Sequence, residues 1–177
     1  MRVTAGEHRN RGLCVPKNGL RPTMDQVRLA LFNILGSVRA ASFLDLYAGS
    51  GSVGIDALSR GAALCVFVDS DPLAGAAIRR NLALLALDGE VYTQAAVSWV
   101  RAWHGEPFDF VFLDPPYPAL AGQCALLGGE MAGLVGKRLI CEYETRQGPP
   151  QFTGLTLDKQ RVYGESALAL YTPERAP

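Results

Sequence analysis

The sequence has 177 residues, of which 49% are hydrophobic and 19% are charged, and its 17 basic and 17 acidic residues give a net charge of zero. This length suits one compact α/β domain, and the apolar content excludes an intrinsically disordered chain. No apolar run approaches the roughly 18 residues that a membrane-spanning helix needs, and residues 1–10 lack the apolar segment of a secretion signal, so we expect a cytoplasmic globular protein.

Basic residues are concentrated at the N-terminal end of the chain. Residues 1–40 contain seven basic and two acidic residues, which leaves the remainder acidic. Because phosphate contacts supply most of the affinity of proteins for RNA, we predict that residues 1–22 form a basic arm that contacts RNA, with a solvated terminal arm as the alternative. On the first predicted helix, we expect Arg28 to be either solvent-exposed or paired with a carboxylate. The candidate phosphate contacts are Arg9, Arg11, Lys17 and Arg21.

Helices and strands alternate along the predicted chain. Thr23 and Gln26 match a helix capping box, and Asp71-Pro72 is a typical helix start. This alternation predicts a mostly parallel sheet with helices on both faces, and the last two strands predict an antiparallel hairpin at its edge. The predicted helices are 24–35, 53–60, 72–87, 98–103 and 119–134, and the predicted strands are 43–48, 63–68, 91–93, 108–113, 138–143, 155–163 and 167–172. In the segment 119–134 the helical periodicity is weakened by Gly122, Gly128, Gly129 and Gly133.

Carboxylates and glycines are found where the predicted strands end. Asp45 precedes glycines at 49, 51 and 54, Asp69 closes the second strand, and Asp114 closes the fourth. Ligands of open parallel sheets bind at the carboxyl ends of the strands. The glycines match the G-x-G-x-x-G pattern of dinucleotide-binding folds, and Asp69 suits a ribose hydroxyl, so NAD is one candidate cofactor.

Asp45 favours a different cofactor. A fixed anion beside the glycines would repel a pyrophosphate, whereas it could accept hydrogen bonds from a cationic amino group such as that of S-adenosylmethionine. We therefore expect S-adenosylmethionine at this turn. A tight strand-to-helix turn without a ligand is the remaining alternative.

The tetrapeptide Asp114-Pro115-Pro116-Tyr117 follows the fourth strand. Its two prolines remove two backbone donors, so the Asp114 carboxylate and the neighbouring carbonyls form a stiff set of acceptors that suits an NH2 group. Tyr117 could stack on a flat base. We predict a site for the exocyclic amine of a nucleobase, and the alternative is that the prolines only end the strand.

These motifs together resemble those of S-adenosylmethionine-dependent amino methyltransferases. The segments Arg2 to Leu13, Arg21 to Arg28 and Leu58 to Ala62 are similar to the RsmD family, and the resemblance covers nearly the whole chain. It implies a Rossmann-like class I methyltransferase fold with a seven-stranded sheet over residues 23–177. It also implies methyl transfer to the N2 amine of a guanine in small-subunit ribosomal RNA. The alternatives are a methyltransferase acting on adenine N6 in DNA or RNA, and a catalytically silent RNA-binding protein.

The resemblance and the strand-end argument give three sets of expected site residues. One departure concerns the stretch after the third strand, which reads Gln94-Ala95-Ala96 where family members commonly carry an acidic residue, so adenine recognition is expected to rest on backbone groups near Ala96. The expected catalytic residues are Asp114, Pro115, Pro116 and Tyr117. The expected cofactor residues are Asp45, Tyr47, Ala48, Gly49, Ser50, Gly51, Gly54, Asp69, Ser70, Ala96 and Asp114. The expected RNA contacts are Arg9, Arg11, Lys17, Arg21, Thr23 and Tyr117.

The cysteines and histidines do not form a metal-binding pattern. The four cysteines stand far apart in the sequence without a CxxC pair, and the only histidines are His8 and His104. We expect reduced, mostly buried cysteines and no metal. The expected partner is ribosomal RNA or the assembled small ribosomal subunit, with the protein acting as a monomer and without a membrane.

Overall fold

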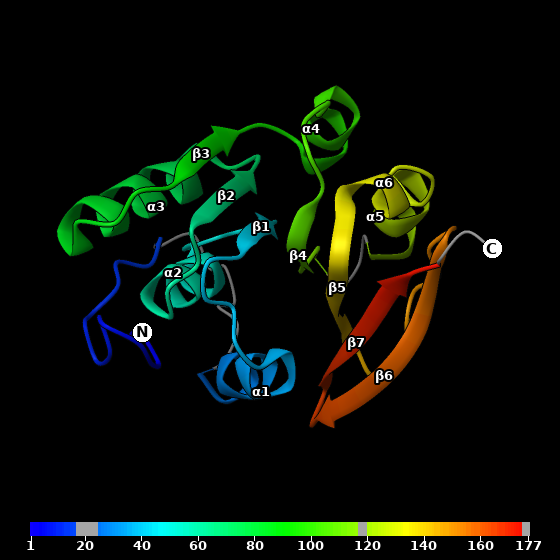
Figure 1. Ribbon diagram of the computed structural model, residues 1–177, viewed down its shortest axis with the longest axis horizontal. Coiled ribbons are helices and arrows are strands. Elements are labelled where there is room, and N and C mark those ends of the chain that lie inside the picture. The colour runs from blue at the N-terminus through cyan, green and yellow to red at the C-terminus, as the bar shows by residue number, and fades with distance from the viewer. Residues whose placement is uncertain (17–24, 117–119, 175–177) are drawn as a thin grey trace. The chain divides into compact units, whose positions relative to one another are not determined.

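The computed structural model describes residues 1–16, 25–116 and 120–174 (Figure 1). The chain divides into two compact units, Met1–Ala95 and Ala96–Pro177. The predicted boundary between an arm and a domain at residue 22 falls inside the first unit and among residues outside the described ranges. It stays a prediction.

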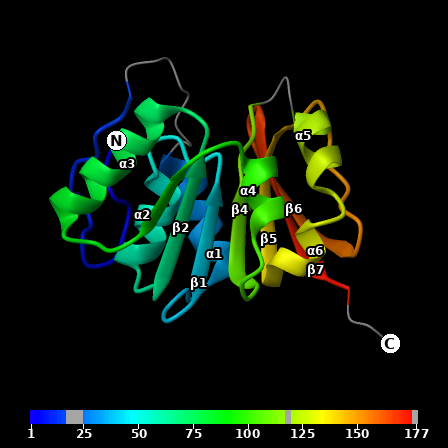
Figure 2. The ribbon, with the colours of Figure 1, turned by 90° about the horizontal axis from the view of Figure 1, so that it is seen from above.

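The first unit is built on three parallel strands in the order β3-β2-β1. They are β1 (Ser42–Leu46), β2 (Leu64–Asp69) and β3 (Glu90–Thr93), and β1 lies beside β2 (Figure 2). The apolar side chains of β1 and those of residues 65–68 on β2 are buried, as in strands covered on both faces, whereas β3 has no buried residue. The first strand ends two residues earlier than predicted because Tyr47 turns the chain with a φ of 61°.

Three helices complete the first unit: α1 (Asp25–Leu35), α2 (Ser52–Ser59) and α3 (Pro72–Leu85). The predicted cap of α3 is confirmed, since the Asp71 side chain accepts a hydrogen bond of 2.8 Å from the Leu73 N–H. The helix ends two residues before the predicted end because Ala86 takes a left-handed conformation with φ 50°. The predicted cap of α1 at Thr23 lies outside the described residues.

The second unit contains four strands in the order β4-β5-β7-β6. Strands β4 (Phe108–Leu113) and β5 (Val135–Glu144) are parallel, whereas β6 (Leu155–Tyr163) and β7 (Ser166–Pro173) form the predicted antiparallel hairpin. Helix α4 (Ala96–Ala102) begins two residues before the predicted helix.

The predicted long helix at 119–134 is wrong. The chain forms two short helices there, α5 (Leu120–Leu127) and α6 (Met131–Leu134), separated by a turn that contains Gly128 and Gly129. Adjacent glycines are poor helix formers because their backbone loses more conformational freedom on folding than that of any other residue. The turn thus falls at two of the four glycines that weaken the helical periodicity in the sequence.

The N-terminal segment is folded rather than free. Residues 1–14, here called the N-terminal hairpin, double back so that the Val3 N–H donates to the Arg11 carbonyl at 2.9 Å and the Leu13 N–H donates to the Met1 carbonyl at 3.1 Å. Val3 and Leu13 are buried against the first unit. The described part of the predicted arm is therefore a fixed surface element.

The sequence also predicts no membrane-spanning helix, no metal site and reduced cysteines. Within the described ranges, no helix is long and apolar enough to cross a membrane. No group of three or more histidine, cysteine or acidic side chains gathers as a metal site among the residues that were placed. All four cysteines are free thiols, and Cys65, Cys124 and Cys141 are buried, as predicted.

Candidate active site

The glycine turn, defined as residues 47–54, joins β1 to α2 at the carboxyl end of the parallel strands. Tyr47, Gly49 and Gly51 have φ values of 61°, 55° and 74°, and a left-handed tyrosine is a strained conformation that its surroundings must maintain. Asp69, at the end of β2, fixes the turn. Its carboxylate accepts hydrogen bonds of 2.8 Å from the Gly49 N–H and 2.8 Å from the Asp71 N–H.

The three glycines of the motif serve different purposes. A Cβ atom on Gly49 would meet nothing within 4 Å, so the backbone there borders open space that a ligand can approach. A Cβ on Gly54 would lie 2.3 Å from a ring carbon of Phe67 and 2.6 Å from the Cys65 sulfur, so this glycine lets α2 pack closely on β2. Of the three glycines, Gly49 is the one whose Cβ side faces open space.

Asp45 lies beneath the turn with 1% of its surface exposed. Its carboxyl accepts a hydrogen bond of 2.9 Å from the Gly54 N–H. Burial raises its pKa to about 8, against the opposing effect of that hydrogen bond and with a further increase from Asp69. The raised pKa favours the protonated carboxyl in the chain by itself, so the fixed anion expected at Asp45 requires a cation beside it. A cation placed beside it would favour its ionised form.

Asn81 on α3 is a polar residue of this region that sequence reasoning missed. It is fully buried and donates hydrogen bonds from Nδ2 to the Ser50 carbonyl at 3.1 Å and to the Cys14 carbonyl at 2.9 Å. Its Oδ1 accepts a bond of 2.7 Å from the Cys14 N–H. The only signal in the sequence was an amide on the apolar face of a predicted helix, next to Leu82 and three residues after Ile78.

The second unit carries the acceptor segment after β4. Asp114 is half-buried, Pro115 is buried and Pro116 is exposed, while Tyr117 lies outside the described residues. Leu113 pairs with Cys141 on β5. Burial, the neighbouring Cys124 thiol and the charge of Asp114 all raise the pKa of Cys141, so this thiol stays protonated.

The structure thus places one group of expected cofactor residues together in the first unit and leaves the others separate. Asp45, the glycine turn, Asp69 and the exposed Ser70 share the carboxyl ends of β1 and β2. Ala96, which is buried at the start of α4, and Asp114 belong to the second unit.

The expected RNA contacts fall in two groups. Arg9 and Arg11 are exposed on the N-terminal hairpin. The others, Lys17, Arg21, Thr23 and Tyr117, lie outside the described residues.

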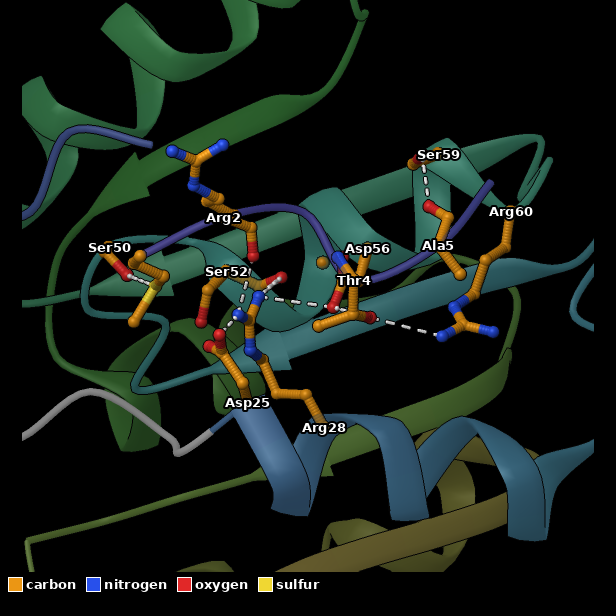
Figure 3. A network of polar contacts seen from close by, with 12 residues as sticks. Arg2, Thr4, Ala5, Asp25, Arg28, Ser50, Ser52, Asp56, Ser59 and Arg60 are labelled. Carbon is orange, nitrogen blue, oxygen red and sulfur yellow. Dashed lines mark hydrogen bonds and ion pairs between the residues drawn. The ribbon is translucent and has the colours of Figure 1, made fainter. Parts of the chain in front are cut away.

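Arg28 is not exposed, so that alternative is wrong and the ion-pair alternative is confirmed. The guanidinium is fully buried and lies 2.6 Å from Asp25 and 3.2 Å from Asp56 (Figure 3). Burial raises the pKa of Asp56, and the charge of Arg28 is the main effect that opposes this. A helix-face arginine is usually solvated, which is why the sequence left both possibilities open.

Comparison with known proteins places this architecture in a family. Residues 1–172 match the family model described as conserved hypothetical protein 95. The ribosomal RNA small subunit methyltransferase D of Escherichia coli K12 is 37% identical over 98% of this chain and 90% of the relative. The chain belongs to the ribosomal RNA small subunit methyltransferase D family. The corresponding protein of Haemophilus influenzae is 36% identical over 97% of this chain and 93% of its own length.

Solved structures agree with this family assignment. The structure of yhhF from Escherichia coli matches 98% of this chain and 98% of its own, with 33% identity and a TM-score of 0.86. The resemblance to the RsmD family and the Rossmann-like methyltransferase fold, with its mostly parallel strands and antiparallel C-terminal hairpin, are confirmed. Membership of the family makes the chain a methyltransferase by class.

Proposed function

We propose that this protein transfers a methyl group from S-adenosylmethionine to the exocyclic N2 amine of a guanine in small-subunit ribosomal RNA. The observation that carries the proposal is the relationship to a ribosomal RNA small subunit methyltransferase, which extends over 98% of the chain at 37% identity. Because the similarity includes the N-terminal hairpin as well as the glycine turn, it supports a shared substrate class in addition to a shared fold.

The residues of the glycine turn suit S-adenosylmethionine chemically. The open side of Gly49 admits a ligand to the backbone, and the partly exposed Asp69 carboxylate has lone pairs left to accept from ribose hydroxyls. Asp45 can ionise and accept a hydrogen bond once a cationic amino group is near. When bound, the cofactor supplies an electrophilic methyl group on a sulfonium. The remaining proposed cofactor contacts are Tyr47, Ala48, Ser50, Gly51, Gly54, Ser70, Ala96 and Asp114.

Asp114 and the Pro115 carbonyl are proposed to hold the guanine amine. Neither proline offers a backbone N–H, so the segment presents acceptors alone to the two N–H groups of the amine. Orientation of the nitrogen toward the methyl group is the main contribution expected of the protein, since positioning can lower a barrier by several kcal/mol. Formation of the new N–C bond would be matched by cleavage of the S–C bond of the sulfonium, with S-adenosylhomocysteine as the leaving group, and the methylated amine would then give up one proton to Asp114 or to water.

RNA is proposed to bind through the N-terminal part of the chain. Arg9 and Arg11 are exposed on the N-terminal hairpin and carry charges that can pair with phosphates. Lys17, Arg21, Thr23 and Tyr117 complete the proposed contacts. A guanine amine is reached only when the base is unstacked, so the target is a loop or a flipped nucleotide.

The test is transfer of radiolabelled methyl from S-adenosylmethionine to ribosomal RNA, both as free RNA and within assembled small subunits, followed by nucleoside mapping. Label on the N2 of a guanine is the expected result. Label on adenine N6 would favour the other class of amino methyltransferase. RNA binding without any transfer would favour a catalytically silent protein, which the Gln94-Ala95-Ala96 departure makes worth testing.

A further inference from the structure

The N-terminal hairpin is fastened to α2 along its inner side. The Thr4 N–H and hydroxyl donate hydrogen bonds of 2.8 and 2.7 Å to the two carboxyl oxygens of Asp56. Further along, the Glu7 N–H donates to the Ser59 carbonyl at 2.8 Å. Gly6 has a φ of 83°, and a Cβ there would lie 1.9 Å from the Ser59 carbonyl oxygen, so the two segments are in direct backbone contact.

Arg28 links this hairpin to the beginning of α2. Its Nη2 donates to the main-chain carbonyl of Arg2 at 2.8 Å, and its Nη1 donates to the Ser52 carbonyl at 3.3 Å and to Asp56 at 3.2 Å (Figure 3). Ser52 directly follows Gly51 of the glycine turn. One buried guanidinium therefore contacts the first strand of the hairpin and the end of the turn.

Asn81 makes a second link at the other strand of the hairpin. Its amide bonds both backbone groups of Cys14 and also the Ser50 carbonyl, so it joins the end of the hairpin to the middle of the glycine turn. Arg28 comes from α1 and Asn81 from α3, and the two side chains bind opposite strands of the hairpin, at Arg2 and Cys14 near its open end. Because each contact is to main-chain atoms, the path of the backbone is fixed whatever side chains it carries.

Stability alone does not account for the buried ion pair. Removing two charges from water costs several kcal/mol per ion, and apolar replacements of buried pairs are often neutral or stabilising. What the pair supplies is a fixed geometry between three segments far apart in the sequence. The outer surface of the hairpin carries Arg9 and Arg11, the proposed phosphate contacts.

We propose that Arg28 and Asn81 are positioning residues that hold the N-terminal hairpin against the glycine turn, so that Arg9 and Arg11 meet RNA phosphates in one fixed orientation. This inference rests on the proposed function in taking RNA as the ligand. A hairpin already ordered before RNA arrives avoids the entropy cost of ordering it on binding. The two residues are thus expected to act on RNA affinity and not on the methyl-transfer step.

The decisive variant is the double substitution Arg28→Met with Asp56→Asn. It removes both buried charges at once, while the new amide can still accept from the Thr4 N–H and donate to the Thr4 hydroxyl. Arg39→Met is the matched control, because Arg39 is exposed in the same unit and the substitution is identical. We expect amide hydrogen exchange of residues 2–13 to quicken about tenfold in the double variant and to remain unchanged in the control.

Steady-state kinetics with ribosomal RNA distinguish an effect on RNA binding from an effect on the methyl-transfer step. The KM for RNA is expected to rise about tenfold, equivalent to about 1.4 kcal/mol, with kcat unchanged and a flatter salt dependence of binding. A kcat that falls at constant KM, or hairpin exchange equal to that of Arg39→Met, would overturn the proposal. Hydrogen exchange needs no RNA, so failure of the proposed function, seen as no methyl transfer by the wild-type protein, is distinguishable from failure of this inference.

A second variant guards against misfolding of the first. Asn81→Leu keeps the branched outline of the side chain at a buried helical position and removes all three hydrogen bonds to Cys14 and Ser50. The same rise in KM and faster exchange near Leu13 are expected. Unchanged exchange near Leu13 in a folded Asn81→Leu protein would also count against the proposal.

Discussion

The buried carboxyl of Asp45 makes the stability of this protein depend on pH. Its pKa is about 8 in the folded chain against an ordinary value of 3.8. Between these values the folded state keeps a proton that the unfolded state releases, so the free energy of unfolding contributed by this group falls as the pH rises and reaches its minimum above about 8. Ionising Asp45 therefore opposes folding until a cation is placed beside it.

Asp45→Asn is expected to be more stable than the wild type because the amide needs no charge in a buried place and can still accept from the Gly54 N–H. The advantage should widen from pH 5 to pH 8 by up to about 1.4 kcal/mol per pH unit and stay constant above that range. Urea unfolding at several pH values measures it, with the exposed Asp158→Asn as control. A stability difference independent of pH would mean that Asp45 is already ionised in the fold.

Asp114→Ala tests the proposed role of the acceptor segment. The change is expected to abolish methyl transfer, since the guanine amine loses the carboxylate that orients it, while cofactor affinity measured by calorimetry changes much less. Asp109→Ala is a suitable control, because it removes a carboxylate from the same strand region without touching the acceptor segment. Equal losses of transfer and of cofactor binding would assign Asp114 to the cofactor instead.

Helix α2 packs closely on strand β2 because Gly54 has no side chain. Gly54→Ala would set a methyl group 2.3 Å from the buried Phe67 ring, so α2 must shift or the ring must leave its position. The expected cost is about 1–3 kcal/mol of unfolding free energy. Gly122→Ala on α5 is the control, since a Cβ there meets nothing within 4 Å and alanine favours a helix. Thermal unfolding of both variants should shift in opposite directions.

The sequence predicted the bounds of an element well wherever the pattern depended only on the residues of that element. Strand β4 falls at the predicted residues, 108–113, because five of its six side chains are apolar and a proline pair ends it. The ends of β1 and α3 were misplaced because Tyr47 and Ala86 take left-handed conformations, and neither position has the glycine that usually signals such a conformation in a sequence. The glycine turn itself was predictable, since its motif combines spacing with a strand end.

On the scale of the molecule, the N-terminal hairpin was the main feature that the sequence could not reveal. Thr4 and Asp56 are 52 positions apart, and Cys14 and Asn81 are 67 apart. Local periodicity says nothing about which distant segment covers a helix, and a basic composition suggests exposure. The sequence therefore allows an ion pair for Arg28, but the burial of Arg28 beneath the hairpin and the contacts of Asn81 depend on the three-dimensional fold.

The basic residues near the N-terminus are the proposed RNA contacts, and this role can be tested by removing two of their charges. Replacing Arg9 and Arg11 with glutamine is expected to weaken RNA binding and to reduce the slope of log affinity against log salt by about 1.4, for two lost phosphate contacts to single-stranded RNA. Binding measured at several salt concentrations gives the slope. The control is Arg146→Gln with Arg161→Gln, two exposed charges of the second unit. An unaltered slope in the hairpin variant would remove these arginines from the RNA interface.

Strand β6 is the edge strand of the second unit, and among the described residues no further strand pairs with its outer edge. The unpaired N–H and C=O groups of an edge strand can pair with another polypeptide, which leads to aggregation. Here it carries Asp158, Lys159 and Arg161, and its register slips between Leu157 and Lys159. Charged side chains of both signs and an interrupted ladder both disfavour edge-to-edge pairing with a second copy of the chain.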